Sequence, residues 1–168
     1  SSIVPYAFGV AGLWKKDHAG WLRPALPWAL FCAGILGLGI MMGAAWAYES
    51  LTFGGYWAWD PVENASMVPW LLLVAGIHTM LIFKSTGQSM KSTYLFIFLT
   101  HLLVLYSTFL TRTGVLGDTS VHSFTGEGST LYWHLLLMQL FFILLPAVLY
   151  YRERKNVPTV AKEESMNS

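Results

Sequence analysis

The chain has 168 residues, of which 55% are hydrophobic and only 11% are charged, and its formal net charge is +1. A soluble domain carries about 25% charged residues, so this composition excludes an ordinary soluble protein, and the small net charge excludes a general affinity for nucleic acid. The single cysteine, Cys32, excludes an internal disulfide, a CxxC redox pair and a cysteine-based zinc site.

Apolar blocks of about 17 to 23 residues follow one another along the chain, and each is long enough to cross a bilayer core of roughly 30 Å. Ahead of them, residues 1–13 are predicted to be the end of a membrane helix or an interfacial segment. The complete predicted spans are 25–47, 67–83, 92–110 and 131–151. The expected fold is therefore an all-α polytopic transmembrane helical bundle, a single fragment with four complete spans and a partial first one.

Basic residues predict how these spans are oriented. They flank three connections, at Lys15, Lys16 and Arg23, at Lys84 and Lys91, and at Arg152, Arg154 and Lys155. The two alternate loops carry a single Lys or Arg between them, Arg112. By the positive-inside rule, the basic connections face the cytoplasm and both long loops face outward. The polar tail 156–168 is then cytoplasmic, and we expect it to be extended or disordered.

The first outward loop is predicted to be a non-helical, aromatic stretch from Trp46 to Pro69. It contains Trp46, Trp57 and Trp59, the rings Tyr48, Phe53 and Tyr56, and the carboxylates Asp60 and Glu63. An interfacial aromatic belt needs only one or two such residues per helix end. Aromatic faces in this number favour a surface for a flat, apolar ligand, whose plane they stack on. A porphyrin fits that description.

The polar residues of this loop are expected to organise its backbone. Asn64 and Ser66 are candidate N-caps for the span that follows, because short polar side chains accept hydrogen bonds from free amide groups. Asp60 and Glu63 are expected to cap helix N-termini or order the loop rather than contact the ligand.

Two sequence blocks resemble one known family. The segment GGYWAWDPVENAS at 54–66, followed by PWL at 69–71, resembles the tryptophan-rich WWD signature of heme-handling proteins of cytochrome c assembly. The resemblance is closest to the CcmF type, with the CcsA type as a relative, and the signature is assigned to 46–70. A second block, FLTRTGVL at 109–116 with SVHSF at 120–124, resembles the outward loop that follows in the CcmF type and is assigned to 111–130.

The resemblance implies a role in cytochrome c biogenesis at the cytoplasmic (inner) membrane. The protein would bind heme at the outer face and present it for covalent attachment to apocytochrome c, as a component of a holocytochrome c synthase (heme lyase). The implied partners are apocytochrome c and either a heme chaperone of the CcmE type or a CcsB-type subunit. No catalytic side chain is expected, because the reaction needs positioning rather than a protein nucleophile. A heme transporter and a b-heme electron-transfer subunit remain alternatives.

The resemblance also implies the iron ligands, for which neutral imidazole is a good donor. His122 in the second outer loop matches an external heme ligand, and His78 inside a span matches a ligand of a membrane-embedded heme b. A helix-bridging hydrogen bond is the alternative for His78. His101, nearly level with His78, is expected to make such a bond, with ligation as its alternative. His134 is expected to anchor the interface and His18 to be solvated.

The remaining cofactor-binding residues are expected in the two outer loops. Trp46, Trp57 and Trp59 would hold the heme ring, and Asn64 would donate hydrogen bonds. Arg112 is expected to pair with a heme propionate, because guanidinium groups recognise carboxylates through paired hydrogen bonds. For Arg112, an interfacial anchor or a pairing with Asp60, Asp118 or Glu127 stays open.

Overall fold

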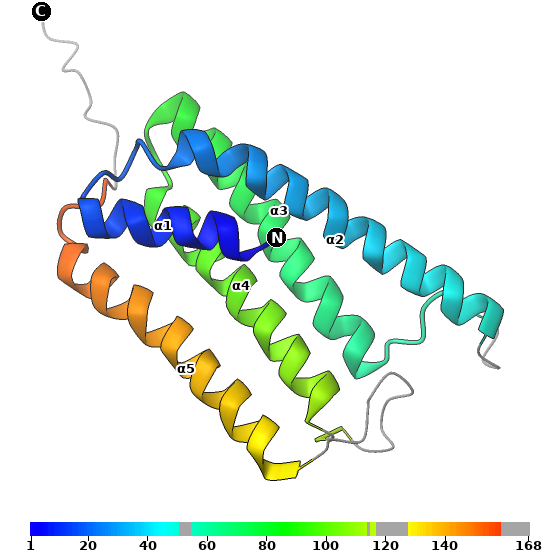
Figure 1. The fold of residues 1–168 in the computed structure, drawn as a ribbon. Helices are drawn as coiled ribbons and strands as arrows, with labels where there is room; N and C mark the ends of the chain where they lie inside the picture. The colour runs from blue at the N-terminus through cyan, green and yellow to red at the C-terminus, as the bar shows by residue number, and fades with distance from the viewer. Residues whose placement is uncertain (51–54, 114, 117–127, 159–168) are drawn as a thin grey trace, which may run out of the picture.

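The computed structural model describes residues 1–50, 55–113, 115–116 and 128–158. It contains five helices, α1 (Ile3–Lys15), α2 (Leu22–Ser50), α3 (Pro61–Thr86), α4 (Met90–Arg112) and α5 (Gly128–Glu153). Helices α2 to α5 run up and down in chain order, and α1 lies against α2, α4 and α5 (Figure 1). The described residues contain no strand, which confirms the all-α bundle.

Four of these helices, α2, α3, α4 and α5, are long and apolar enough to cross a membrane by length and composition. They correspond to the four complete spans predicted from the sequence. Helix α1 has 13 residues, so at 1.5 Å per residue it extends about 20 Å and is shorter than a bilayer core. The chain is therefore a multi-pass membrane protein with a short first helix.

The boundaries of the aromatic loop differ from the prediction. Helix α2 continues through Trp46 to Ser50, and α3 already begins at Pro61. The N-cap of α3 is Asp60, so the predicted start at Met67 and the predicted caps at Asn64 and Ser66 are wrong. The reason is the sequence Asp-Pro-x-Glu, since Pro suits the first helical position and Asp60 and Glu63 form a capping box.

The core lies mainly toward one end of the bundle, where α1 ends and α2 begins. Trp21 is 4% exposed and its indole stacks on Tyr94 of α4, with ring centroids 5.0 Å apart. On its other side it packs so closely on Gly12 that a side chain there would overlap the indole. Large side chains from three helices, α1, α3 and α4, complete this core, namely Leu13, Leu73, Met80, Met90 and Ile97.

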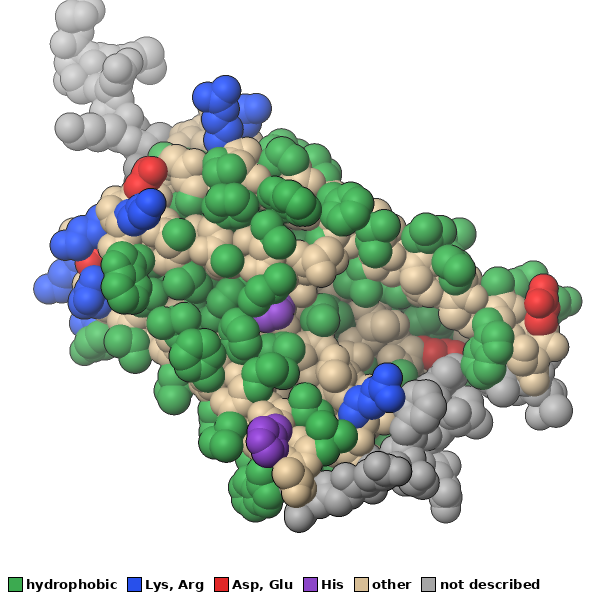
Figure 2. All heavy atoms as spheres, in the orientation of Figure 1, with side chains coloured by type: hydrophobic (Ala, Val, Ile, Leu, Met, Phe, Trp, Pro, Cys, Tyr) green, Lys and Arg blue, Asp and Glu red, His purple; other side chains and the backbone are tan. Residues whose placement is uncertain are grey.

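This end of the bundle also carries the basic residues, so we call it the basic end. Figure 2 shows Lys and Arg gathered there, which agrees with the prediction that three basic connections share one side. At its centre the carboxylate of Glu153 lies 3.7 Å from Lys16 and 3.7 Å from Arg152, and accepts a hydrogen bond from Asn156. Val157 is only 3% exposed, so the start of the predicted extended tail is packed; residues 159–168 lie outside the described residues.

His18 at the basic end is buried, and the prediction that it is solvated is wrong. Its Nδ1 lies 3.1 Å from the hydroxyl of Tyr94, and its Nε2 is buried with no hydrogen-bond partner among the described residues. Burial of the imidazole lowers the pKa of His18 below its ordinary value, against the raising effect of the carboxylates of Glu153 and Asp17. The chain fold, rather than local sequence, creates this environment, because Tyr94 is 76 residues away.

Candidate functional site

The opposite end of the bundle carries the aromatic residues of the signature, and we call it the outer end after its predicted orientation. Tyr48 at the end of α2 stacks on Tyr56, with ring centroids 4.3 Å apart and planes 6° from parallel. Trp57 and Trp59 meet edge to face at 6.3 Å. Trp59 is 69% exposed and Tyr56 58% exposed, so each ring keeps more than half of its surface open, although one face of Tyr56 lies on Tyr48.

The capping box of α3 fixes the backbone beneath these rings. Glu63 is only 9% exposed, and its carboxylate accepts hydrogen bonds from the amides of Ala58 (2.9 Å) and Asp60 (3.3 Å). Asp60 in turn accepts a hydrogen bond from the amide of Val62 at 2.8 Å. The prediction that Asp60 and Glu63 cap a helix and order the loop is therefore confirmed.

Trp59 has an unusual backbone conformation that Asn64 supports. Its φ is 59°, in the left-handed region, which costs a non-glycine residue about 1–3 kcal/mol. The side-chain amide of Asn64 donates to the carbonyl of Trp59 at 3.0 Å. Asn64 thus holds Trp59 in place through the backbone, and its expected hydrogen bond is made within the chain.

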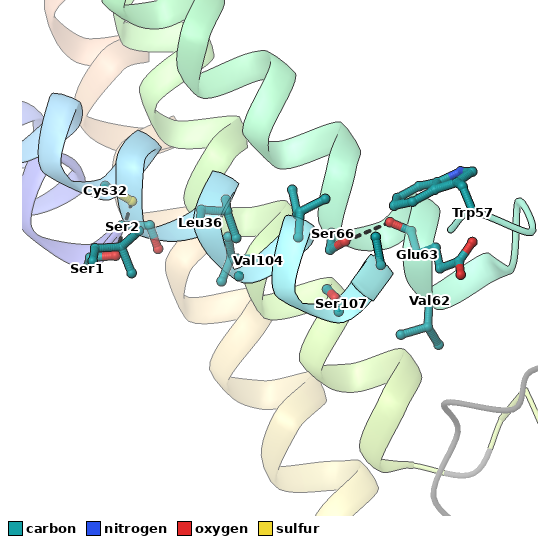
Figure 3. Close-up of a pocket in the computed structure, with 15 residues that line it drawn as sticks. Ser1, Ser2, Cys32, Leu36, Trp57, Val62, Glu63, Ser66, Val104 and Ser107 are labelled. Atoms are coloured by element: carbon teal, nitrogen blue, oxygen red, sulfur yellow. Dashed lines mark hydrogen bonds between the residues drawn. The ribbon is translucent and has the colours of Figure 1, made fainter. Parts of the chain in front are cut away.

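A pocket with a cavity volume of about 350 Å³ extends from these rings along α2. Figure 3 shows Trp57 and Glu63 at one end and Ser1 beside Cys32 at the other. The residues of α2 that line the pocket recur every three or four positions, as expected for one face of a helix. They include Gly39 and Gly43, where an added Cβ would meet no atom within 4 Å. The indole nitrogen of Trp57 is buried without a hydrogen-bond partner in the described part of the chain.

Trp70, the tryptophan that follows the signature, joins α3 to α2. Its indole nitrogen donates to the carbonyl of Ala33 at 3.0 Å. This approach requires glycine at position 37, because a Cβ there would lie 2.9 Å from the same nitrogen. Sequence reasoning had no means of finding this contact, which joins residues 37 positions apart.

His78 lies within α3, and its side chain is exposed on the surface of the bundle. Its Nδ1 lies 2.7 Å from the carbonyl oxygen of Val74. A carbonyl only accepts hydrogen bonds, so Nδ1 donates in this contact, and in the neutral imidazole Nε2 is then the nitrogen with the lone pair. An imidazole held in this tautomer presents Nε2 as a ligand, which is the arrangement common at metal sites.

His101 faces a different direction from His78. It is 5% exposed, its Nδ1 lies 3.0 Å from the hydroxyl of Ser2, and its ring packs between Tyr6 and Phe142. These contacts join α4 to α1 and α5, so the expected hydrogen bond between helices is confirmed. Because His78 is exposed and His101 is buried, the two imidazoles are not paired in this arrangement.

The other predicted residues lie at the outer end or outside the described residues. Trp46 is half-exposed on α2, and Arg112 is the exposed last residue of α4. His134 is exposed near the start of α5, and its Nδ1 lies 2.7 Å from the carbonyl of Thr130. His122 lies outside the described residues. Within the ranges that the structure describes, no three His, Cys, Asp or Glu side chains gather as a metal site.

A family model described as "Cytochrome C assembly protein" matches residues 13–116, more than half of the chain. The chain belongs to this cytochrome c assembly family. The match includes the signature, α3 with His78, and α4, and it confirms the resemblance found in the sequence.

Individual relatives agree with this family membership. The chain is 43% identical over 125 residues to CcmF of Pseudomonas aeruginosa, covering 74% of this chain and 19% of that protein. It is 41% identical over 139 residues to CycK of Bradyrhizobium diazoefficiens, covering 82% and 21%. The solved structure of the cytochrome c heme lyase CcmF superposes with a TM-score of 0.70 at 36% identity, covering 89% of this chain and 23% of that one.

This member of the cytochrome c assembly family spans about one fifth of the length of the curated relatives it matches. Its helices and its relatives support a multi-pass inner-membrane protein. The relatives that it matches are cytochrome c-type biogenesis proteins.

Proposed function

We propose that this chain forms the part of a heme lyase that binds heme at the outer face of the membrane and presents it to apocytochrome c. The observation that carries the proposal is the outer end itself, where open aromatic faces stand on a backbone held by a capping box. Exposed aromatic faces on an ordered backbone suit a flat apolar ligand, and a porphyrin plane has the matching shape.

The residues present at the outer end fit a heme. The exposed indoles of Trp46 and Trp59 offer faces for the ring. The buried indole N–H of Trp57 lacks an acceptor among the described residues, and a propionate oxygen would satisfy it. Arg112, at the same end, is proposed to pair with a propionate, and His122 is proposed to ligate the iron from the second outer loop.

A second heme, of the b type, is proposed at His78. The support is the tautomer that the Val74 carbonyl imposes, which leaves Nε2 available on an exposed face of α3. Nothing else in the described chain covers that nitrogen, so the second ligand would come from another part of the full-length protein. When bound, such a heme supplies one-electron chemistry that keeps the iron of the transferred heme reduced.

The proposed reaction adds two cysteine S–H groups of apocytochrome c across the two vinyl groups of heme, and each addition forms one thioether bond. The chain contributes positioning: the aromatic rings hold the porphyrin, and the histidine fixes the iron. The proposed partners are apocytochrome c and a CcmE-type chaperone or a CcsB-type subunit. The basic end is proposed to face the cytoplasm and the aromatic loop the exterior.

Heme content of the full-length protein tests the ligand assignments. We expect His78→Ala to remove the heme b spectrum measured as pyridine hemochrome after purification from heme-replete cells. His134→Ala is the matched control, because His134 makes the same 2.7 Å contact to a carbonyl four residues earlier. Equal heme content in both variants would contradict the assignment of His78.

Covalent heme attachment tests the lyase role against its alternatives. Co-expression with apocytochrome c should yield heme that survives denaturation in a gel, and Trp57→Ala with Trp59→Ala should abolish it. A transporter would deliver external heme without any thioether bond. An electron-transfer subunit would keep its heme spectrum and function in that double variant.

A further inference from the structure

A groove between α2 and α3 at the basic end has the composition of a lipid site. Its cavity volume is about 520 Å³. One wall is formed by Leu22, Arg23 and Leu26, and the other by Met80, Phe83 and Lys84. We propose that this groove binds an anionic phospholipid, with the phosphate at Arg23 and Lys84 and an acyl chain along the apolar walls.

The two cations are available for a ligand. Arg23 and Lys84 are both exposed, and neither forms an ion pair with a carboxylate among the described residues. Three other cations at this end have partners, since Lys16 and Arg152 lie 3.7 Å from Glu153 and the guanidinium of Arg154 lies 3.8 Å from the ring centre of Tyr151. A basic pocket between two membrane helices is a recognised feature of sites for anionic headgroups.

The order of residues along each wall matches a phospholipid. Leu26 follows Arg23 by three residues on α2, and Met80 precedes Lys84 by four on α3. On both helices the apolar residue therefore lies roughly 4.5–6 Å deeper in the bundle than the charge. A soluble anion would use the cations without the apolar walls, whereas a phospholipid uses both.

The groove is separate from the aromatic outer end, which lies at the other end of α2 and α3. It is also distinct from the groove between α4 and α5, whose lining includes one cation, Lys91. The pairing of two cations over an apolar floor therefore favours a doubly contacted phosphate. The lipid site does not depend on the proposed heme chemistry.

Lipid binding to the full-length protein in detergent tests the proposal. After delipidation, binding of a fluorescent phosphatidylglycerol is measured with unlabelled phosphatidylglycerol, phosphatidylcholine or inorganic phosphate as competitor. Only phosphatidylglycerol should compete at low concentration. The double variant R23Q/K84Q should bind about thirtyfold more weakly, as expected for two contacts of roughly 1 kcal/mol each.

The matched control is K15Q/K155Q, which removes the same charge from exposed positions at the same end. Circular dichroism and heme content of both double variants report whether they fold like the parent. Equal weakening in both would overturn the site in favour of general attraction to the basic end. Competition by inorganic phosphate would show that the groove binds a soluble anion instead. Competition by phosphatidylcholine would show that apolar contacts alone bind the lipid. Failure of the intact protein to bind phosphatidylglycerol would overturn the proposal, because another segment would then cover the groove.

Discussion

The two ends of this bundle use aromatic residues in opposite ways. At the basic end, Trp21 and Tyr94 stack face to face and are 4% and 1% exposed. At the outer end, Tyr56 and Trp59 keep more than half of their surface exposed while hydrogen bonds hold the backbone below them. The basic end is stabilised by packing of its aromatic side chains on one another. The outer end is instead ordered by hydrogen bonds to its backbone, which leaves the exposed surface of its rings available for a ligand.

The largest expected effect separates the two ends by stability. Trp21→Ala should lower the free energy of unfolding by about 3–5 kcal/mol, because it removes a large side chain from a packed core. Trp14→Ala is the control, since Trp14 is 65% exposed. Thermal unfolding of the full-length protein in detergent measures both. If the folded fraction of the Trp21 variant loses its heme, the two ends are not independent.

A smaller effect is expected from the outer end. Glu63→Ala leaves the amides of Ala58 and Asp60 without their acceptor, at a cost of about 1–3 kcal/mol. Heme content should fall more than stability does, because the tryptophan loop loses its anchor. Glu49→Ala removes an exposed carboxylate from the end of α2 and should leave heme content unchanged. If both variants lost the same amount of heme, the effect of Glu63→Ala would come from the removed charge and not from the lost hydrogen bonds.

The contact between α2 and α3 is expected to matter less. Trp70→Phe removes the indole donor to the Ala33 carbonyl while keeping an aromatic ring, which should cost about 1 kcal/mol. Trp28→Phe, at an exposed position on α2, serves as the comparison in the same unfolding assay. An unchanged unfolding midpoint in the Trp70 variant would show that this hydrogen bond adds nothing to helix packing.

The smallest effect is a pH dependence at the basic end. The pKa of His18 is lowered by burial, so below about pH 6.5 the unfolded chain binds a proton that the folded chain does not. The free energy of unfolding should therefore decrease as the pH falls below about 6.5, and it should not change through His18 above that pH. In His18→Gln the unfolding midpoint should depend less on pH below about 6.5 than in the parent protein, as measured across a pH series. The same acid slope in both proteins would exclude His18 as its cause.

The sequence predicted the helices better than the contacts between them. Hydropathy located all four spans, because a bilayer imposes a length that apolar runs reveal directly. It missed the start of α3, where the capping box extends the helix six residues ahead of Met67. The burial of His18 against Tyr94 and the bond from His101 to Ser2 depend on residues 76 and 99 positions away. No local pattern carries that information.

The signature itself was recognisable, yet the roles within it were only partly so. Asp60 and Glu63 were expected to cap, and they do. Asn64 was expected to donate hydrogen bonds to a ligand; its amide donates one to the carbonyl of Trp59, and its contact with a ligand stays a prediction. The fourth residue of a helix can reach back to the loop before it, and a sequence motif does not separate that role from ligand contact.

The left-handed backbone at Trp59 sets stability against activity at a single position. Glycine adopts this conformation without steric penalty, so Trp59→Gly would relax the main chain while deleting the most exposed of the described rings in the loop. A screen for thermostable variants would accept that change, whereas a screen for cytochrome c maturation would reject it. Under the proposed function, tryptophan persists there through selection for ligand binding, at the expense of a more relaxed fold.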